Sequence, residues 1–435
     1  MKKDSNKKYF GTSSQKELLK LYAKYVNSPK VRLFKGFGLG VIPGERKGVK
    51  ISTLEGAKPT EPPMDLYNCH SCGGVYNLGH GNPKIVQVLK DALDSGLDIG
   101  DHLLLSEWRA LLGKKLADLM PPGITKTTFG VSGGEAVDSA IKFSRAHTKR
   151  KKCISAIGGF HGHTGFALAA GDPSFREKFL WTNPDFKQIL FGDVESLKKN
   201  ISDDVACVIL ETIPASAGVL IAQEGYFSEV RRLCDEHDVM MIIDEVQTGL
   251  GRTGHFWAIY GGLYEHEKVI PDFIVLGKGM SAGIYPISSC SYKPFIENAV
   301  FKDDPFIHIS TTGGSDLGCV VTCEMLNIQS KPEFLNHVKE MGKLFGKGLE
   351  EIANDNSKLV KEVRGRGLMW GIEFKSETIG QFAMLSIIKE GVLQNYCGNK
   401  TNTLILMPPL IVKEDEIEEI LKRIGEGIKK IKHLA

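Results

Sequence analysis

Between about residue 84 and residue 325, short apolar runs alternate with stretches of helical periodicity. The apolar runs at 206–210 and 239–243 predict strands, and the stretches at 134–149 and 226–237 predict helices. Alternation of this kind is typical of βαβ units, in which each helix returns the chain to a parallel strand. We therefore expect an α/β fold whose large domain contains a mostly parallel sheet flanked by helices.

The C-terminal part follows a different pattern. A short predicted strand at 404–407 is broken by two prolines, and an amphipathic helix follows. The apolar positions of that helix keep helical spacing: Ile417, Ile420, Leu421, Ile424, Ile428 and Ile431. Because 435 residues exceed what one core usually supports, we expect a smaller α+β domain built from both chain ends, 1–83 and 326–435, beside the large domain at 84–325.

The composition excludes several classes of protein. With 42% hydrophobic and 25% charged residues, the chain is not intrinsically disordered. Its net charge of +3 is too small to indicate a nucleic-acid partner. No apolar run reaches the length of a membrane span, and the residues after Met1 do not resemble a secretory signal. We therefore expect a soluble cytoplasmic protein that binds neither nucleic acid nor a membrane.

The nine cysteines are scattered and odd in number, so they do not form a disulfide framework. Cys69 and Cys72 form the one Cys-x-x-Cys pair, and a zinc site would need a second pair of ligands at matching spacing. Cys319 and Cys323 are typical of small core residues. We expect buried thiols and no metal site.

Two charged residues follow two of the apolar runs. Asp244 follows the run 240–243, and Lys278 follows the run 273–276 after one glycine. Ligands of open α/β sheets bind at the carboxyl ends of the strands, so both side chains are expected at one crevice. An amine for a Schiff base and a carboxylate for a pyridinium nitrogen are what pyridoxal phosphate requires. The alternatives are an Asp that caps a helix and a Lys on the surface.

Two further segments could contribute to such a site. Ser132, Gly133 and Gly134 open a predicted helix, where exposed N–H groups suit a phosphate. Glycine before a helix is also common without any ligand. Phe160 follows the predicted strand 153–157 and could stack on a planar cofactor, although an ordinary core phenylalanine is the alternative.

The segment 242–254, with the sequence IIDEVQTGLGRTG, resembles the signature of class III aminotransferases, which are pyridoxal-phosphate enzymes of fold type I. The resemblance extends over nearly the whole chain. Further motifs lie in the same order as in the family, at 77–83, 132–136, 160–162, 276–279, 310–314 and 363–369.

The resemblance implies a role for each matching residue. Lys278 would form the Schiff base with the cofactor and then carry a proton, and Asp244 would pair with the pyridine nitrogen. The other implied cofactor-site residues are Ser132, Gly133 and Gly134 at the phosphate, Phe160 and Val246 on the ring faces, Gln247 at the ring hydroxyl, and His161 and Glu211 nearby. Thr311 would reach the phosphate of the neighbouring subunit, so the family's unit, a homodimer, is expected.

The departures from the family pattern concern the substrate. Members that handle glutamate or α-amino acids have an arginine where this chain has Ile405 and a glutamate where it has Ser216. Ornithine-type members have a bulky tyrosine where this chain has Gly73. Losing the arginine and the glutamate together is physically coherent, because either one alone would be an unpaired buried charge. We therefore expect a roomy, uncharged pocket for an amine or a bulky amino compound, with a keto acid as acceptor.

Two alternatives remain at this point. The family also contains epimerases, aminomutases and decarboxylating transaminases, and an epimerase or mutase would need no keto acid for turnover. A nucleotide-binding α/β protein without catalytic activity is the other alternative, and it would not depend on Lys278. The Gly-rich loop of this chain, at 132–134, lacks both the Lys-Ser/Thr ending of a nucleoside-triphosphate site and the spacing of a dinucleotide fingerprint, which disfavours this second alternative.

Overall fold

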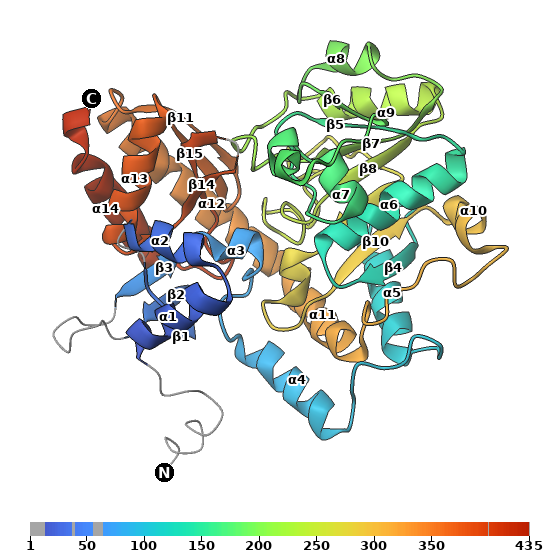
Figure 1. The fold of residues 1–435 in the computed structure, drawn as a ribbon, viewed down its shortest axis with the longest axis horizontal. Helices are drawn as coiled ribbons and strands as arrows, with labels where there is room; N and C mark the ends of the chain where they lie inside the picture. The colour runs from blue at the N-terminus through green and yellow to red at the C-terminus, as the bar shows by residue number, and fades with distance from the viewer. Residues whose placement is uncertain (1–13, 37–39, 55–63, 399, 435) are drawn as a thin grey trace.

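The computed structural model describes residues 14–36, 40–54, 64–398 and 400–434. They form two lobes, one around a seven-stranded sheet and one around two four-stranded sheets (Figure 1). The order of the large sheet is β4-β10-β9-β8-β7-β5-β6. Its strands are β4 (Lys126–Gly130), β5 (Lys152–Ala156), β6 (Phe186–Ile189), β7 (Val205–Glu211), β8 (Met240–Asp244), β9 (Phe273–Leu276) and β10 (Ser288–Tyr292).

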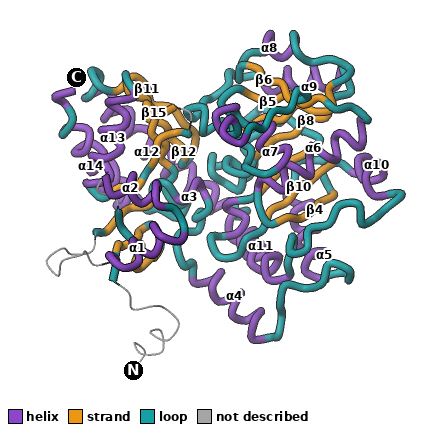
Figure 2. The backbone as a smooth tube through the Cα atoms, in the orientation of Figure 1, coloured by secondary structure: helices purple, strands orange, loops and turns teal. Residues whose placement is uncertain are grey.

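The large sheet is mostly parallel, as the sequence predicts. Strands β6, β5, β7, β8 and β9 pair in parallel, and β10 runs antiparallel to β9 and to β4. The helices of this lobe are α4 (Pro83–Asp94), α5 (Glu107–Leu119), α6 (Gly133–Thr148), α7 (Gly165–Ala170), α8 (Val194–Lys198), α9 (Tyr226–Glu236), α10 (Glu297–Phe301) and α11 (Asp316–Gln329). Because the chain returns through helices, both faces of the sheet are covered (Figure 2).

Strands β7 and β8 are buried along their whole length, which explains their apolar sequences. On β8, Ile242 packs in the core shared with α6, whereas Met241 and Ile243 pack in the core on the opposite face. Alternate residues of a strand point to opposite faces, so a continuous apolar run serves two cores. The strand ends with a single charged residue, Asp244, where the sheet ends.

The smaller lobe combines elements from both ends of the chain. Its first sheet has the order β1-β2-β3-β13, and the parallel pairing of β3 with β13 joins an N-terminal strand to a C-terminal one. Its second sheet has the order β11-β12-β15-β14. The strands are β1 (Pro43–Lys47), β2 (Lys50–Thr53), β3 (Asp65–Asn68), β11 (Val360–Arg366), β12 (Met369–Phe374), β13 (Val392–Leu393), β14 (Asn395–Cys397) and β15 (Lys400–Leu406). Figure 1 shows the blue N-terminal elements beside the orange and red C-terminal ones.

The helices of the smaller lobe are α1 (Gln15–Tyr25), α2 (Ser28–Gly36), α3 (Ser71–Gly74), α12 (Pro332–Asp355), α13 (Glu377–Lys389) and α14 (Glu414–Lys429). Helix α14 is the predicted amphipathic closing helix, and it buries Ile417, Ile420, Ile424 and Ile428. The domain limits at residues 83 and 325 stay predictions.

Candidate active site

Three ionisable side chains lie at the carboxyl edge of the large sheet. Glu211 ends β7, Asp244 ends β8, and the two residues are paired in register. Lys278 follows β9, the next strand, and begins a single 3-10 turn. The parallel order of the strands therefore brings together residues that lie far apart in the sequence, as the positions of Asp244 and Lys278 predict.

Asp244 and His161 form a buried pair. The Nδ1 atom of His161 lies 2.8 Å from Oδ2 of Asp244, and both residues are at most 5% exposed. Burial alone lowers the pKa of His161, but the hydrogen bond to Asp244 and the charges of Asp244 and Glu211 outweigh it and raise the pKa. The contact with Asp244 therefore favours the charged form of the His161 imidazole.

Glu211 holds the backbone next to this pair. Its Oε1 accepts a hydrogen bond from the N–H of Phe160 at 2.9 Å. Burial, followed by the nearby charge of Asp244, raises the pKa of Glu211 to about 7, against the opposing effect of His161 and Lys278. A carboxyl group with such a pKa changes its charge near neutral pH, which is common at functional sites.

Lys278 is held with its amine close to these acids. Its backbone φ of 36° is in the left-handed region, which costs a side-chain-bearing residue energy and persists only where its surroundings impose it. Burial lowers the pKa of Lys278, although the charges of Asp244 and Glu211 act in the opposite direction. A lowered pKa increases the fraction of neutral amine, the form that attacks a carbonyl carbon.

Helix α6 begins beside the same edge. Ser132 caps it, and its hydroxyl accepts a hydrogen bond from the N–H of Glu135. A Cβ atom at Gly133 would lie 3.0 Å from Cγ1 of Val246, and one at Gly134 would lie 2.8 Å from Oγ1 of Thr164. Glycine is therefore required for the close approach of α6, whose N-terminal N–H groups and dipole suit an anion.

A cavity of about 320 Å³ opens beside Lys278. It brings together the three predicted substrate-pocket residues, Gly73, Ser216 and Ile405, with Phe160 and Gln247. A second cavity, of about 330 Å³, is lined by Lys278 and Ser132. Lys278 therefore lies between the predicted phosphate loop and the predicted substrate pocket.

Gly73 leaves space directly over Lys278. A Cβ atom at Gly73 would lie 3.4 Å from Cε of Lys278 and 3.4 Å from Nε2 of Gln247. That amide donates a hydrogen bond to the carbonyl of Gly73 at 2.8 Å. Gly73 belongs to a run of four residues, 71–74, that all have positive φ. Left-handed conformations are unfavourable for residues with a side chain, so the neighbouring contacts hold this turn in place.

One predicted site residue does not join this constellation within the chain. Thr311 is exposed and lines neither cavity beside Lys278. The structure also adds wall residues that sequence analysis does not identify: His70, Cys72, Phe175, Ala215, Asn395, Tyr396, Cys397, Gly398 and Met407. Most have no recognisable signal, because loop folding brings them to the cavity. His70 has one, since it follows an apolar run at 66–67 and neighbours the Cys-x-x-Cys pair.

Arg252, which is part of the recognised signature, has a structural role. It is 0% exposed, and its guanidinium donates to the carbonyls of Leu368 and Pro408 and to Oδ1 of Asn77. Burial lowers its pKa to about 9. The buried guanidinium of Arg252 thus joins the large lobe to an N-terminal segment at Asn77 and to C-terminal segments at Leu368 and Pro408.

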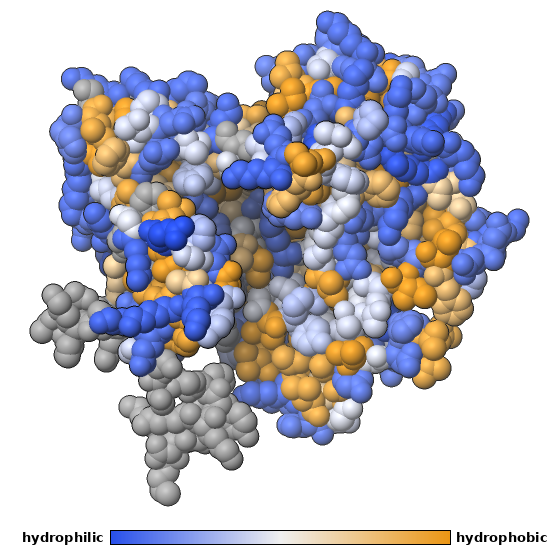
Figure 3. Space-filling view, in the orientation of Figure 1, coloured by the Kyte–Doolittle hydropathy of each residue, from blue (hydrophilic) through white to orange (hydrophobic). Residues whose placement is uncertain are grey.

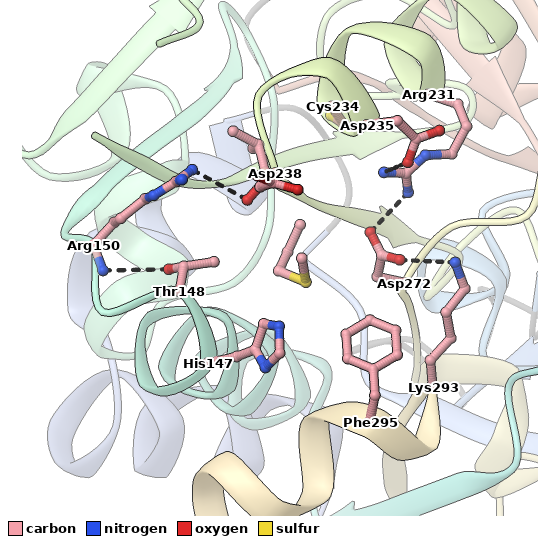
Figure 4. A pocket seen from close by; sticks show the side chains of 12 residues that line it. His147, Thr148, Arg150, Arg231, Cys234, Asp235, Asp238, Asp272, Lys293 and Phe295 are labelled. Atoms are coloured by element: carbon pink, nitrogen blue, oxygen red, sulfur yellow. Dashed lines mark hydrogen bonds and ion pairs between the residues drawn. The ribbon is translucent and has the colours of Figure 1, made fainter. Parts of the chain in front are cut away.

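A larger cavity, of about 480 Å³, lies at the opposite edge of the sheet, where β8 begins (Figure 4). Four of its charged side chains, those of Arg231, Asp235, Asp272 and Lys293, are paired with one another. Asp272 accepts from Arg231 at 2.7 Å and from Lys293 at 2.8 Å, and the three form a network below β9. The carboxyl ends of the parallel strands, where ligands bind, do not reach this cavity.

The described residues contain neither a metal-ligand cluster nor a membrane-spanning helix. Within residues 14–36, 40–54, 64–398 and 400–434, no group of three or more His, Cys, Asp or Glu side chains could hold a metal ion. Over the same residues, no helix has the length and apolar character needed to cross a membrane.

Comparisons with known proteins agree with this geometry. The family model described as aminotransferase class III matches residues 42–428. An uncharacterized aminotransferase of Archaeoglobus fulgidus is 44% identical over 417 residues, which cover 96% of this chain and 95% of that protein. The chain belongs to the class III aminotransferase family.

Solved structures show the same fold. The ornithine aminotransferase of Toxoplasma gondii, which was found with partial occupancy of PLP at its active site, matches with a TM-score of 0.86 at 22% identity, covering 100% of this chain and 99% of that one. The acetylornithine aminotransferase of Elizabethkingia anophelis matches with a TM-score of 0.77 at 28% identity, over 93% and 99% of the two chains. The expected fold, fold type I, is confirmed.

Proposed function

We propose that Lys278 holds pyridoxal phosphate covalently and that the enzyme transfers an amino group from an amine or bulky amino compound to a keto acid. The residues fit this cofactor by their own chemistry. A half-buried amine of lowered pKa suits an aldehyde, and the carboxylate of Asp244 suits a protonated ring nitrogen. The glycines at the start of α6 leave room for a phosphate near N–H groups.

When bound, the cofactor supplies an electron sink for the pair of electrons left at the substrate carbon. The surrounding residues then have separate tasks. Asp244, held by His161, would pair with the ring nitrogen and favour its protonated form. Once the donor amine has displaced it from the cofactor, the free amine of Lys278 would be placed to accept a proton from the substrate carbon and then to donate it, as general base and general acid. Phe160 and Val246 would enclose the ring, and Gln247 would hydrogen-bond its hydroxyl.

The preference for an uncharged substrate rests on the cavity wall. Among its described residues, the cavity beside Lys278 has no carboxylate and no guanidinium. Arg364, which lies near the wall residue Cys397, is tied to the carbonyl of Gly218 and to Glu373. An amine donor that carries a distal carboxylate therefore finds no free guanidinium there.

The first experiment follows the visible absorbance of the bound cofactor while amine donors are added one at a time, without a keto acid. Loss of the band with a simple aryl alkyl amine, and not with glutamate, is the expected result. Loss with glutamate would reject the substrate preference and keep the transamination. The Lys278→Ala variant should lack the band and nearly all turnover, and turnover at the parental rate would refute the role of Lys278.

We also propose a homodimer in which Thr311 reaches the site of the neighbouring subunit. Two exposed apolar segments support a subunit interface: Leu103, Leu104 and Leu105 are 66%, 69% and 104% exposed, and Phe306 and Ile307 are 53% and 62% exposed. Figure 3 shows hydrophobic side chains at the lower right of the molecule, over the loop between α4 and α5. Exposed patches of this kind mark protein–protein contacts.

Complementation tests this arrangement. Neither Lys278→Ala nor Thr311→Ala alone should form a fully competent site. If the two residues of one site come from different subunits, mixed dimers should contain one intact site each, about a quarter of all sites at equal mixing. Cofactor retention that stays at the average of the two separate variants after mixing would place Thr311 outside the partner's site.

A further inference from the structure

The cavity beside Lys278 has one imidazole in its wall, that of His70. The backbone around His70 is fixed. Its carbonyl accepts from the N–H of Gly73 at 2.8 Å, and the next residue, Ser71, donates its N–H to Oδ1 of Asn68 at 2.8 Å. The side chain of His70, by contrast, makes no hydrogen bond with any described residue. A half-buried ring on a fixed backbone is thus presented to the cavity with its polar atoms available.

The surroundings of His70 favour its neutral form. Burial, and then the charge on Lys278, lower its pKa below the ordinary value of 6.5. A neutral imidazole has one N–H donor and one nitrogen acceptor. It can therefore pair with a hydroxyl or an amide, whereas it offers no positive charge to a carboxylate.

The rest of the wall suits a flat, apolar body. The rings of Phe160 and Phe175 pack edge to face with their centroids 5.3 Å apart, and Tyr396 lies in the same cavity. Ser216 and Gly398 keep the wall open. Aromatic walls of this kind bind planar or aliphatic groups through area and shape.

We propose that His70 is a specificity-determining residue, which hydrogen-bonds an uncharged polar group at the distal end of the amine donor. The donor class is an aryl or similarly bulky alkyl amine with a hydroxyl or amide substituent. The inference rests on the proposed function and adds the chemistry of the donor's far end. It does not concern the residues that hold the cofactor.

Tyramine and phenethylamine, which differ only by one hydroxyl, test this assignment. In the parent, half-saturation for loss of the visible band should come at roughly tenfold lower tyramine than phenethylamine, the value of about one hydrogen bond. His70→Phe should abolish this preference by weakening tyramine, and His70→Gln, which keeps a donor and an acceptor, should restore most of it. A preference that survives in His70→Phe, or is absent from the parent, would overturn the assignment.

His163→Phe is the matched control. The ring of His163 lies 5.2 Å from that of Phe160, but the residue does not line the cavity, so the preference should be unchanged. An equal loss of the preference for tyramine in His163→Phe and His70→Phe would indicate a general disturbance of the aromatic wall and would count against a specific role for His70.

A second measurement does not depend on turnover. Cys72 is exposed and lines the same cavity, whereas the other cysteines are buried or half-buried. The rate of Cys72 alkylation is obtained by subtracting the alkylation that remains in a Cys72→Ser variant. In the parent, tyramine should slow this rate more than phenethylamine does. In His70→Phe, both amines should slow it equally. If neither amine removes the visible band, the proposed transamination of such amines is refuted. If both amines protect Cys72 of the parent equally from alkylation, the role of His70 is refuted independently.

Discussion

The Nδ1 atom of His161 lies 2.8 Å from Oδ2 of Asp244, and the other ring nitrogen of His161 is buried without a partner among the described residues. Among the described residues, Asp244 is therefore the hydrogen-bond partner that orients the imidazole. In return, the imidazole gives the buried carboxyl group of Asp244 a hydrogen-bond partner, and a buried polar group without a partner would be costly. The two residues therefore form one buried unit at the proposed cofactor site.

Asp244→Asn should leave the visible band of the bound cofactor in place and slow the amine half-reaction by about a hundredfold or more, because the ring nitrogen loses its negative partner. Stopped-flow absorbance measures this rate. Asp272→Asn is the control, because that carboxylate pairs with Arg231 and Lys293 at the opposite edge of the sheet. It should reduce stability and keep the rate; an equal rate loss in both variants would contradict the role of Asp244.

The stability of the protein should depend on pH through Glu211. Its folded-state pKa of about 7 lies above the ordinary value of 4.5, so its contribution is complete below pH 4.5 and is lost as the pH rises through about 7. The loss amounts to at most about 3 kcal/mol. Urea unfolding at pH 5 and pH 8 should therefore show a smaller decline for Glu211→Gln than for the parent. Identical declines would mean that Glu211 titrates normally.

Gly133 and Val246 should show coupled effects on cofactor binding. Gly133→Ala places a methyl group 3.0 Å from Cγ1 of Val246, which requires one of the two segments to move. Overpacking of this kind costs about 1–3 kcal/mol. The dissociation constant of the cofactor should rise accordingly, and Val246→Ala in the same chain should recover part of the loss. If the binding free-energy changes of the two single variants simply add in the double variant, the contact between Gly133 and Val246 is not the cause of the weaker cofactor binding.

Ile405→Arg should change the preference for charged donors. Ile405 lines the cavity beside Lys278 and is 5% exposed, so an arginine there would add the missing carboxylate partner. The half-reaction with glutamate should improve roughly tenfold, the value of one charge-assisted hydrogen bond, and aryl amines should react more slowly. Ile405→Met controls for size. Unchanged activity with amines, without a gain for any carboxylate, would refute this account of the pocket.

Arg252→Met should destabilise the protein by several kcal/mol, because the carbonyls of Leu368 and Pro408 and the amide of Asn77 lose their donor. Urea unfolding measures the effect. Arg232→Met is a suitable control, since that arginine pairs with glutamates on the surface of α9. Exposed pairs contribute about 0–1 kcal/mol, so a similar loss in both variants would mean that the buried contacts of Arg252 are not decisive.

The parts of the fold with strong periodicity could be predicted from the sequence. The apolar runs that end at Asp244 and Lys278 are strands buried on both faces, and the isoleucines of α14 face the core. The reversed direction of β10 could not be predicted, because its sequence, Ser288–Tyr292, carries no sign of direction. Strand direction depends on the length and path of the connections, which local patterns do not encode.

The candidate site shows the same division. Ser132, which belongs to a contiguous motif, lines the same cavity as Lys278, whereas its role at a phosphate stays a prediction. Wall residues such as Phe175 and Tyr396 come from loops and short strands, and only the packing of the two lobes places them in the cavity. The pairing of His161 with Asp244 also depends on geometry, since 83 positions separate the two residues.

The three contacts of Arg252 bear on how the enzyme moves during its cycle. These contacts link Asn77, Leu368 and Pro408 to the large lobe through a single buried guanidinium. If the lobes rotated apart at this junction, the guanidinium of Arg252 would remain in the protein interior without its hydrogen-bond partners, at a cost of several kcal/mol. We therefore expect the two lobes to keep their relative positions at Arg252 when a substrate enters, which leaves the adjustment to side chains and surface loops.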